Sequence, residues 1–464
     1  MIESNTAGNT ITPKRLFLFV LVCLIVITVV WMPLSDGTEF YGMLHADPLD
    51  TFMDLFNSIH DSRFDDPYTA RGVIYPPLTY MYYRLCGSIL PDADKGEEPW
   101  YARQIALDWR NSQSGIFLAL ATTVVSYILL IFALLPPEKR NDIAARRLTC
   151  LVVLGTVPFW YAVERGNLIL LTLAFLAYFV TNYKSESKVR RELALICLGV
   201  ATAFKIYPAI FGLLLLREKK FFAAGRCVIY GLVLLFMPFV LFGGFDSVGV
   251  LIGNIMNTNE HMTTYGMGYK VDLGNTISFV SACLHRPIGG QTVIKCFFLV
   301  VLLVVFVLTK KEWQRYMSLC VAMIIFPGFS YTYTLVFAAI PLLIFLKENP
   351  RTTTRNLLYA LLFLGMFAPL PFGGKKLFEN EPKYLYQLNL TTIVSSFSIL
   401  VFTVLMAVDT VICRIRHEHE NEMTQAEVRK SVIWFCAIAL IFAACVTVFC
   451  VYSNYLFNLD VMPI

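Results

Sequence analysis

Charged side chains are scarce in this sequence. Asp, Glu, Lys and Arg make up 15% of the 464 residues and hydrophobic residues make up 57%, whereas a soluble domain has about 25% charged residues. A surface built from this chain would be largely apolar, which excludes a soluble monomer. The net charge is +5, but the basic residues are spread along the chain, so no nucleic-acid partner is expected.

Metal-binding and disulfide patterns are absent as well. The chain has 12 cysteines, mostly within apolar runs, and no two of them form a CxxC pair. This pattern argues against a zinc site and against a disulfide framework. No internal repeat, no low-complexity stretch and no carboxylate pair with clear metal-ligand spacing stands out. We therefore expect no metal and no other cofactor.

Long apolar runs are what the sequence has instead. Lipid cannot hydrogen-bond the backbone, so apolar runs of about 20 residues must be helical. The first run, at 16–34, follows Lys14 and Arg15 and precedes no small-residue cleavage site, so we expect it to be retained. Clear later runs lie at 114–135, 227–242, 293–308, 357–371, 392–412 and 432–452, and shorter ones at 148–163, 168–182, 192–203, 206–216, 316–326 and 333–345. The sequence predicts an all-α polytopic membrane protein with about 13 transmembrane segments, some of them broken.

The basic clusters predict the orientation of these segments. Alternate threading puts all of the clusters on one face, with 24 of the 38 Lys and Arg residues, and such a face is cytoplasmic. The opposite face receives a long loop, 35–113, with 13 acidic and 6 basic residues. We expect a plasma-membrane protein with a cytoplasmic N-terminus. The clusters lie at 14–15, 139–147, 184–191, 217–226, 310–315, 347–355 and 414–430.

The long external loop contains two features of interest. A helix over 51–60 would place Phe52, Leu55 and Ile59 on one apolar stripe, as in a helix that lies at the membrane interface. Asp54 lies within this stripe, and a carboxylate on a partly buried face needs a partner or a function. Tyr75 precedes two prolines that suit the first turn of a second interfacial helix.

Two cations interrupt apolar segments on the external side. Lys205 divides the apolar stretch 193–216, and Arg165 occupies a second break, at 164–167. A cation within the membrane is costly and suggests a functional site, although each could also reach out to lipid phosphate. Together they suggest capture of an anionic head group, of which a lipid-borne phosphate is the natural candidate.

Five short motifs along the chain resemble those of glycosyltransferase family 87. The resemblance covers about residues 15–345 and rests on the order of individually weak motifs. They are Phe52-Met-Asp54-Leu, Tyr75-Pro76-Pro77-Leu78, Glu164-Arg165-Gly166-Asn167, Lys205-Ile-Tyr207-Pro208 and Gly274-Asn275-Thr276-Ile-Ser278. The family includes mycobacterial mannosyltransferases that use polyprenol-phosphate mannose.

The resemblance implies a membrane-embedded GT-C fold and an active site on the external face. It also implies a polyprenyl-phosphate sugar as donor, inversion at the anomeric carbon, and a first-loop aspartate, Asp54 here, as base. Mannose is the family-level expectation for the sugar, and the acceptor would be a lipid or a glycan. We expect residues 1–345 to form the catalytic membrane module and residues 346–464 to add C-terminal transmembrane helices.

The remaining candidate residues take supporting roles in this hypothesis. Lys205 and Arg165 would bind the donor phosphate, and Tyr75 would line the cavity. Asp47 is the alternative base. Family members often carry a histidine in the late external turn, where this sequence instead has tyrosines that could contact a sugar or phosphate. The external loop that precedes this turn offers two more candidates for such contacts. These further candidates are Lys270, Asn275, Tyr331 and Tyr333.

Two other classes of protein remain open on the sequence alone. A lipid-linked-sugar flippase or transporter would also have broken helices and buried cations, but such transporters often show two repeated halves with paired broken helices. A surface-glycan polymerase or ligase would use a diphosphate-linked oligosaccharide. The interpretation that we favour is a hexosyltransferase embedded among membrane lipids.

Overall fold

The computed structural model describes residues 11–44, 48–93, 99–264, 270–284, 288–328, 330–370 and 389–415, and a few positions from 423 to 437. These residues are mainly helical, and the one strand-like pairing among them is an isolated antiparallel bridge between Lys270 and Tyr331. The chain forms two compact units. Unit 1 comprises Met1–Met43, Tyr265–Phe326 and Ser330–Ile464, and unit 2 comprises Leu44–Thr264 and Pro327–Phe329.

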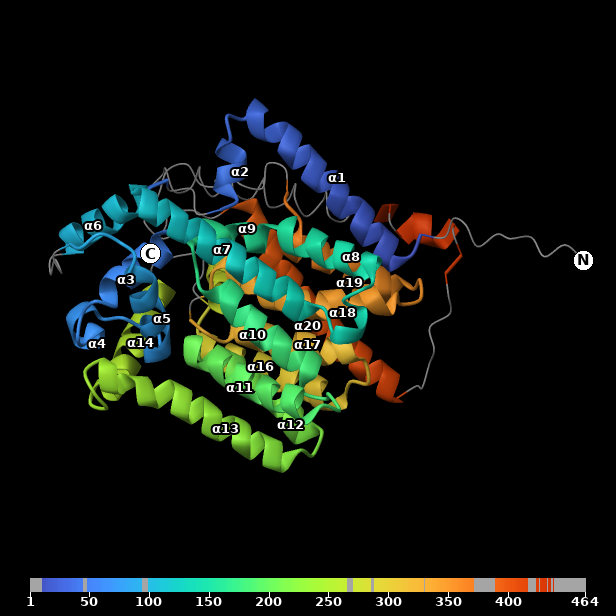
Figure 1. Ribbon diagram of the computed structural model, residues 1–464. Coiled ribbons are helices and arrows are strands. Elements are labelled where there is room, and N and C mark those ends of the chain that lie inside the picture. Colours follow the sequence, from blue (N-terminus) through green and yellow to red (C-terminus); the bar gives the residue numbers. More distant parts are fainter. Residues whose placement is uncertain are drawn as a thin grey trace, which may run out of the picture. The chain divides into compact units, whose positions relative to one another are not determined.

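Unit 2 contains a series of long apolar helices. Helices α7, α10, α11 and α13 pack against one another in that order (Figure 1). With η marking a 3-10 helix, the elements are η1 (Pro48–Asp50), α3 (Met53–Asp61), α4 (Pro67–Arg71), α5 (Pro77–Gly87), α6 (Pro99–Asn111), α7 (Gln113–Leu134), η2 (Pro137–Lys139), α8 (Ile143–Leu154), α9 (Val157–Arg165), α10 (Ile169–Asn182), α11 (Lys188–Phe204), η3 (Tyr207–Gly212), α12 (Leu213–Arg217), α13 (Phe221–Phe236), η4 (Met237–Leu241) and α14 (Ser247–Thr264).

The first-loop helices α3, α5 and α6 share one buried core within unit 2 with α7, α10 and η4. Phe56 and Ile59 of α3, Tyr80 of α5 and Trp109 of α6 are all buried in this core. Burial of large apolar and aromatic side chains contributes about 1.5–3 kcal/mol for each residue. The loop is therefore a folded part of unit 2, and it holds the N-terminal end of α3 in place.

Unit 1 has buried helices between longer ones. Trp313 of α17 is buried against Phe345, Tyr359 and Phe402, which come from three other helices of the unit. Helix α1 packs against α19, and α16 packs against α17 and α20. The elements are α1 (Pro13–Leu34), α2 (Thr38–Gly42), α15 (Leu273–Leu284), α16 (Gln291–Leu308), α17 (Glu312–Ile325), η5 (Thr332–Ala338), α18 (Ala339–Glu348), α19 (Thr354–Phe367) and α20 (Leu390–Ile415).

Several helices have the length and composition of membrane spans. Within the described residues there are five such segments, or six if α8 and α9, which are bent by 57° at a short break, count as one. The five are Pro13–Leu34, Gln113–Leu134, Phe221–Leu241, Gln291–Leu308 and Leu390–Arg414. Four of them match a predicted run to within three residues, and Phe221–Leu241 begins six residues before the predicted run at 227–242. This agreement supports a helical membrane protein.

Two of the long predicted runs are not among these five spans. The run at 357–371 corresponds to α19, which has 14 residues, and most of 432–452 lies outside the described residues. The count of about 13 segments stays a prediction. So does the division into a catalytic module of residues 1–345 and C-terminal helices 346–464.

Candidate functional site

The N-terminal end of α3 is fixed against the C-terminal end of α9. Phe52 has φ +60°, and its N–H donates to the carbonyl of Glu164 at 2.6 Å. Gly166, with φ +62°, ends α9, and a Cβ there would lie 3.0 Å from Cβ of Leu55 and 3.1 Å from Cδ1 of Phe52. Only glycine combines this φ with such a close approach. The junction places the first turn of α3 next to the 164–167 break.

Asp54, in that first turn, has hydrogen-bond donors on both of its carboxylate oxygens. Arg165 donates from Nε at 3.2 Å and from Nη2 at 2.5 Å to Oδ1. Asn167 donates from Nδ2 to Oδ2 at 2.7 Å. The side chain is 17% exposed. Hydrogen bonds of this charge-assisted kind hold a carboxylate in one orientation, and Oδ2 keeps capacity to accept another proton donor.

The orientation of the Asn167 amide follows from its second contact. Its Oδ1 accepts the backbone N–H of Ile169 at 3.0 Å, so its Nδ2 must face Asp54, because an amide nitrogen cannot accept that bond. Nδ2 also lies 3.5 Å from the hydroxyl of Tyr75. Asn167 thus links the carboxylate of Asp54 to Tyr75, two residues before the start of α5.

Arg165 lies between two carboxylates. Besides Asp54, its Nη1 donates to Oδ2 of Asp50 at 3.0 Å and to the carbonyl of Asp50 at 3.2 Å. Arg103 of α6 donates to the other oxygen of Asp50 at 3.2 Å, and Arg110 of the same helix donates to the carbonyl of Leu49 at 3.1 Å. The observed contacts of Arg165 are therefore those of a residue that orients carboxylates, and its role as a phosphate ligand stays a prediction.

Lys205 lies where the sequence analysis expects a break between helices. Helix α11 ends at Phe204 and η3 begins at Tyr207. The hydroxyl of Thr79 on α5 donates to the carbonyl of Phe204 at 2.9 Å, which ties the break to the first-loop helices. The ammonium of Lys205 lies 4.6 Å from the centroid of the Tyr75 ring, within the range of a cation–π contact. At 7% exposed, Lys205 is a buried cation.

A second group of predicted residues meets within unit 1. The backbones of Lys270 and Tyr331 pair in the isolated bridge, and Asn275 donates from Nδ2 to the carbonyl of Lys270 at 2.5 Å. The rings of Tyr331 and Tyr333 have centroids 5.7 Å apart. Burial lowers the pKa of the Lys270 ammonium and raises the pKa of the nearby Asp272 carboxyl, so burial favours the neutral form of each.

The structure thus brings Asp54, Arg165, Tyr75 and Lys205 together in unit 2, and the other candidates together in unit 1. The exception is Asp47, which lies outside the described residues. Within the described ranges, no three His, Cys, Asp or Glu side chains gather as metal ligands.

Three residues near the candidate sites were missed by the sequence analysis. Asn167 belongs to the motif at 164–167 and could have been named as a site residue for that reason. Asp50 and Asp272 gave no signal, because only the folded chain shows their neighbours.

Comparison with known proteins gives the family. The family model for glycosyltransferase family 87 matches residues 105–370, which is more than half of the chain. The match includes Arg165, Lys205 and the group around Lys270, while Asp54 and Tyr75 lie before its start. Searches of curated proteins and of solved structures found no match. The chain belongs to glycosyltransferase family 87, and it is accordingly a helical membrane glycosyltransferase that moves a sugar from a donor to an acceptor.

Proposed function

We propose that this protein is an inverting hexosyltransferase of the GT-C fold. It would move a sugar, mannose in the first place, from a polyprenyl-phosphate donor to a lipid or glycan acceptor at the external face of the plasma membrane. The observation that carries the proposal is the carboxylate of Asp54, which is half-buried and held by Arg165 and Asn167. No metal or other cofactor is required.

The distribution of charge supports the external location. The acidic loop that carries Asp54 is predicted to face outward, since the basic clusters belong on the cytoplasmic side. A lipid-linked donor reaches such a site from the membrane, where its polyprenyl chain stays among the lipids. The half-buried environment of Asp54 suits a reaction between a lipid-borne phosphate and a hydroxyl group.

The chemistry needs one base and one site for an anion. The acceptor oxygen would attack the anomeric carbon and form the new glycosidic bond, while the bond from that carbon to the phosphate oxygen breaks on the opposite side. The hydroxyl proton passes to Asp54, and the electron pair of the broken bond leaves with polyprenyl phosphate. The departing phosphate is a stable anion, so it needs a cation rather than an acid.

Lys205 is the cation we assign to that phosphate. Its ammonium is buried, it lies over the Tyr75 ring, and that ring leads through Asn167 to Asp54. An ammonium in a site shielded from water stabilises developing negative charge more strongly than it would in water. Arg165 would orient Asp54 and contribute positive charge next to the reacting groups.

The group around Lys270 is assigned to secondary contacts with sugar or phosphate. The Oδ1 atom of Asn275 is buried and has no hydrogen-bond partner within the described part of the chain. A sugar hydroxyl would satisfy such an acceptor, which is otherwise costly to bury. Tyr331 and Tyr333 offer ring faces and hydroxyl groups of the kind that contact sugars.

Replacement of the proposed base tests this function. Asp54→Asn keeps the size of the side chain and removes its basicity, so transfer of mannose from purified polyprenyl-phosphate mannose should fall by at least about 10²-fold. Asp61→Asn is the matched control, because Asp61 lies on the same helix and pairs with Arg71 instead. Full activity of Asp54→Asn together with loss in Asp47→Asn would move the base to Asp47 and leave the reaction class in place.

Donor competition tests the substrate class. Polyprenyl-phosphate glucose and arabinose would show which sugar is used, and a diphosphate-linked oligosaccharide would be the donor of a glycan polymerase. Purified protein in detergent should release polyprenyl phosphate without a membrane gradient. Turnover of the diphosphate-linked donor alone would contradict the proposal.

A further inference from the structure

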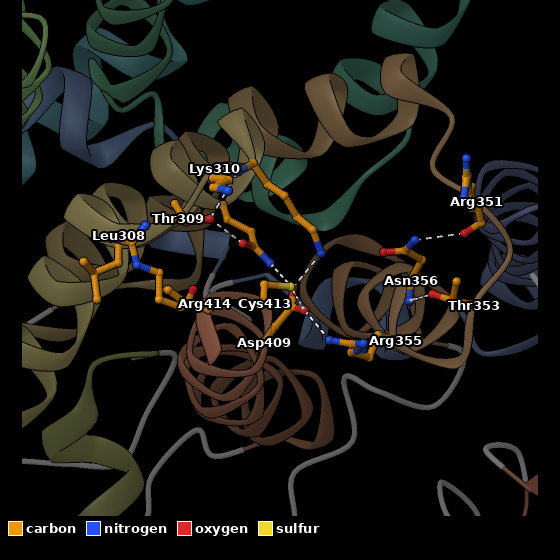
Figure 2. A pocket seen from close by; sticks show the side chains of 13 residues that line it. Leu308, Thr309, Lys310, Arg351, Thr353, Arg355, Asn356, Asp409, Cys413 and Arg414 are labelled. Carbon is orange, nitrogen blue, oxygen red and sulfur yellow. Dashed lines mark hydrogen bonds and ion pairs between the residues drawn. The ribbon is translucent and has the colours of Figure 1, made fainter. Parts of the chain in front are cut away.

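A polar pocket of about 620 Å³ lies within unit 1, where the ends of α16, α17, α19 and α20 meet (Figure 2). Its volume is in the range of pockets that bind small ligands. Five cations and a single carboxylate line it. They are Lys310, Lys311, Arg351, Arg355, Arg414 and Asp409.

Asp409 compensates only part of this positive charge. Its carboxylate is 1% exposed and accepts from Nζ of Lys311 at 2.7 Å and from Nη1 of Arg355 at 2.6 Å. Gln314 donates to the same carboxylate at 2.6 Å. Figure 2 shows Arg355 joined to Asp409 by a dashed line. The single negative charge of Asp409 therefore neutralises only one of its two cationic partners, and the other three cations of the pocket have no carboxylate in the lining.

The other three cations are Lys310, Arg351 and Arg414, and all three are exposed. Within the described residues, no ion pair involves their side chains. The lining has a net charge of about +4 when each ionised group is counted once. Like charges gathered in one concave site repel one another unless an anion binds among them.

The cations that line the pocket come from three basic clusters that are far apart in the sequence, and the last cluster contributes Arg414 among the described residues. The three clusters are those at 310–315, 347–355 and 414–430, which the positive-inside rule places on the cytoplasmic face. None of these residues belongs to the site around Asp54 or to the group around Lys270. The proposed transfer reaction on the external face therefore does not explain the pocket.

The composition of the flanking helices indicates that the pocket lies near the boundary between lipid and water. Helices α16 and α20 are two of the five segments long enough to span a membrane. Close to the pocket, Leu308 at the end of α16 is 39% exposed and Val411 on α20 is 49% exposed. Apolar side chains exposed next to a ring of cations are typical of the level at which lipid phosphates lie.

We propose that this pocket binds a phosphate-bearing anion at the cytoplasmic face. An anionic lipid head group and a soluble phosphate ester share this chemistry. Arg351 and Arg414 carry planar guanidinium groups that can each donate two parallel hydrogen bonds to phosphate oxygens. Lys310 adds a point charge, while Lys311 and Arg355 stay positioned by Asp409 at the back of the pocket.

Native mass spectrometry of the full-length protein in detergent tests this site. The probes are phosphatidylglycerol, phosphatidylcholine and sn-glycerol 3-phosphate. The wild-type protein should retain phosphatidylglycerol or glycerol phosphate in preference to phosphatidylcholine. In the triple variant Lys310→Gln, Arg351→Gln, Arg414→Gln, binding should weaken on the order of 100-fold, because each cation near a phosphate contributes about a fivefold change.

A second triple variant provides the matched control. Arg146→Gln, Arg147→Gln and Lys188→Gln also remove three exposed cations from the face predicted to be cytoplasmic, but these lie in unit 2. Binding should stay within about threefold of the wild type in this variant. Thermal unfolding of both variants is measured to show that they fold.

The outcomes separate the sources and decide the proposal. Retention of phosphatidylglycerol with no binding of glycerol phosphate identifies a lipid head group, whereas tight binding of glycerol phosphate identifies a soluble ester. Equal losses in the two triple variants would overturn the proposal, because the attraction would then belong to the whole basic face. Equal binding of phosphatidylcholine and phosphatidylglycerol would also overturn it.

Discussion

Two carboxylates in this protein are held by cations, and their surroundings differ. Asp54 in unit 2 accepts from Arg165 and Asn167 and is 17% exposed. Asp409 in unit 1 accepts from Lys311, Arg355 and Gln314 and is 1% exposed. The contacts are chemically alike, but only Asp54 leaves its carboxylate open to another molecule. The comparison indicates that Asp409 stabilises unit 1, whereas Asp54 is available for chemistry.

Loss of the Asp409 charge should have the largest effect on stability. Asp409→Asn leaves Lys311 and Arg355 without their counter-ion. Asp409 is buried but Lys311 is 38% exposed, so the cost should lie at the lower end of the range for a broken buried ion pair, about 3 kcal/mol. Denaturant unfolding of the purified protein measures the change. Asp61→Asn, at a partly exposed pair with Arg71, should cost less than about 1 kcal/mol. Equal costs for the two variants would remove the contrast between buried and accessible carboxylates.

Removal of the Lys205 charge should act on catalysis rather than on folding. Lys205→Met keeps much of the aliphatic stem, and kcat/KM for the polyprenyl-phosphate donor should fall about 10²-fold, the scale for loss of one group that stabilises transition-state charge. The unfolding midpoint should not fall, because a buried ammonium is replaced by an apolar side chain. Wild-type kcat/KM in Lys205→Met would contradict the role of Lys205 in binding the leaving phosphate.

Loss of the Asn167 amide should have a smaller effect of the same kind. Asn167→Ala removes the donor to Oδ2 of Asp54, while Arg165 still holds Oδ1. We therefore expect kcat to fall about tenfold with little change in KM, near the lower end of the about 1.5–3 kcal/mol that a hydrogen bond to a charged group is worth. Asn182→Ala is the control, because that buried amide on α10 bonds to the carbonyl of Tyr178 in its own helix. Similar loss of activity in both variants would mean that general packing, not orientation of Asp54, is responsible.

The junction between α3 and α9 gives the smallest expected effect. Gly166→Ala forces a Cβ into φ +62° and against Leu55 and Phe52, which costs about 1–2 kcal/mol. Gly225→Ala, within α13 and with nothing close to the added Cβ, should be neutral or stabilising by up to about 1 kcal/mol. Thermal unfolding compares the two. A neutral Gly166→Ala would show that the junction tolerates movement of α3.

Much of the helical architecture could be predicted from the sequence because long apolar runs have few alternatives in lipid. The ends of α7 and α16 lie within two residues of the predicted runs, and Lys205 lies in the expected break. Helix α6 was not predicted, because the hydropathy of its sequence gives no apolar run. Its arginines Arg103 and Arg110 nevertheless hold the segment before Asp54.

The candidate site could be predicted only in part. The motifs identify Asp54 and Arg165 separately, but 111 residues separate them, and no spacing rule joins residues that far apart. The same holds for Asp409, which lies in an apolar run typical of a membrane span. Its partners Lys311 and Arg355 lie at the N-terminal ends of two other helices, α17 and α19. These pairings depend on how helices pack, which composition and periodicity do not specify.

The pairing of Arg165 with Asp50 and Asp54 also has a consequence for the order in which the chain is made. Synthesis proceeds from the N-terminus, so both carboxylates are outside the ribosome before the arginine that pairs with them. Helix α9 has only nine residues and ends in Glu164 and Arg165, and it has the length of a span only together with α8, so it is a poor candidate for membrane insertion by itself. The charged end of α9 would then pack against the first loop, which has been synthesised earlier. Shortening that loop should therefore lower the yield of folded protein at smaller deletions than those that lower activity.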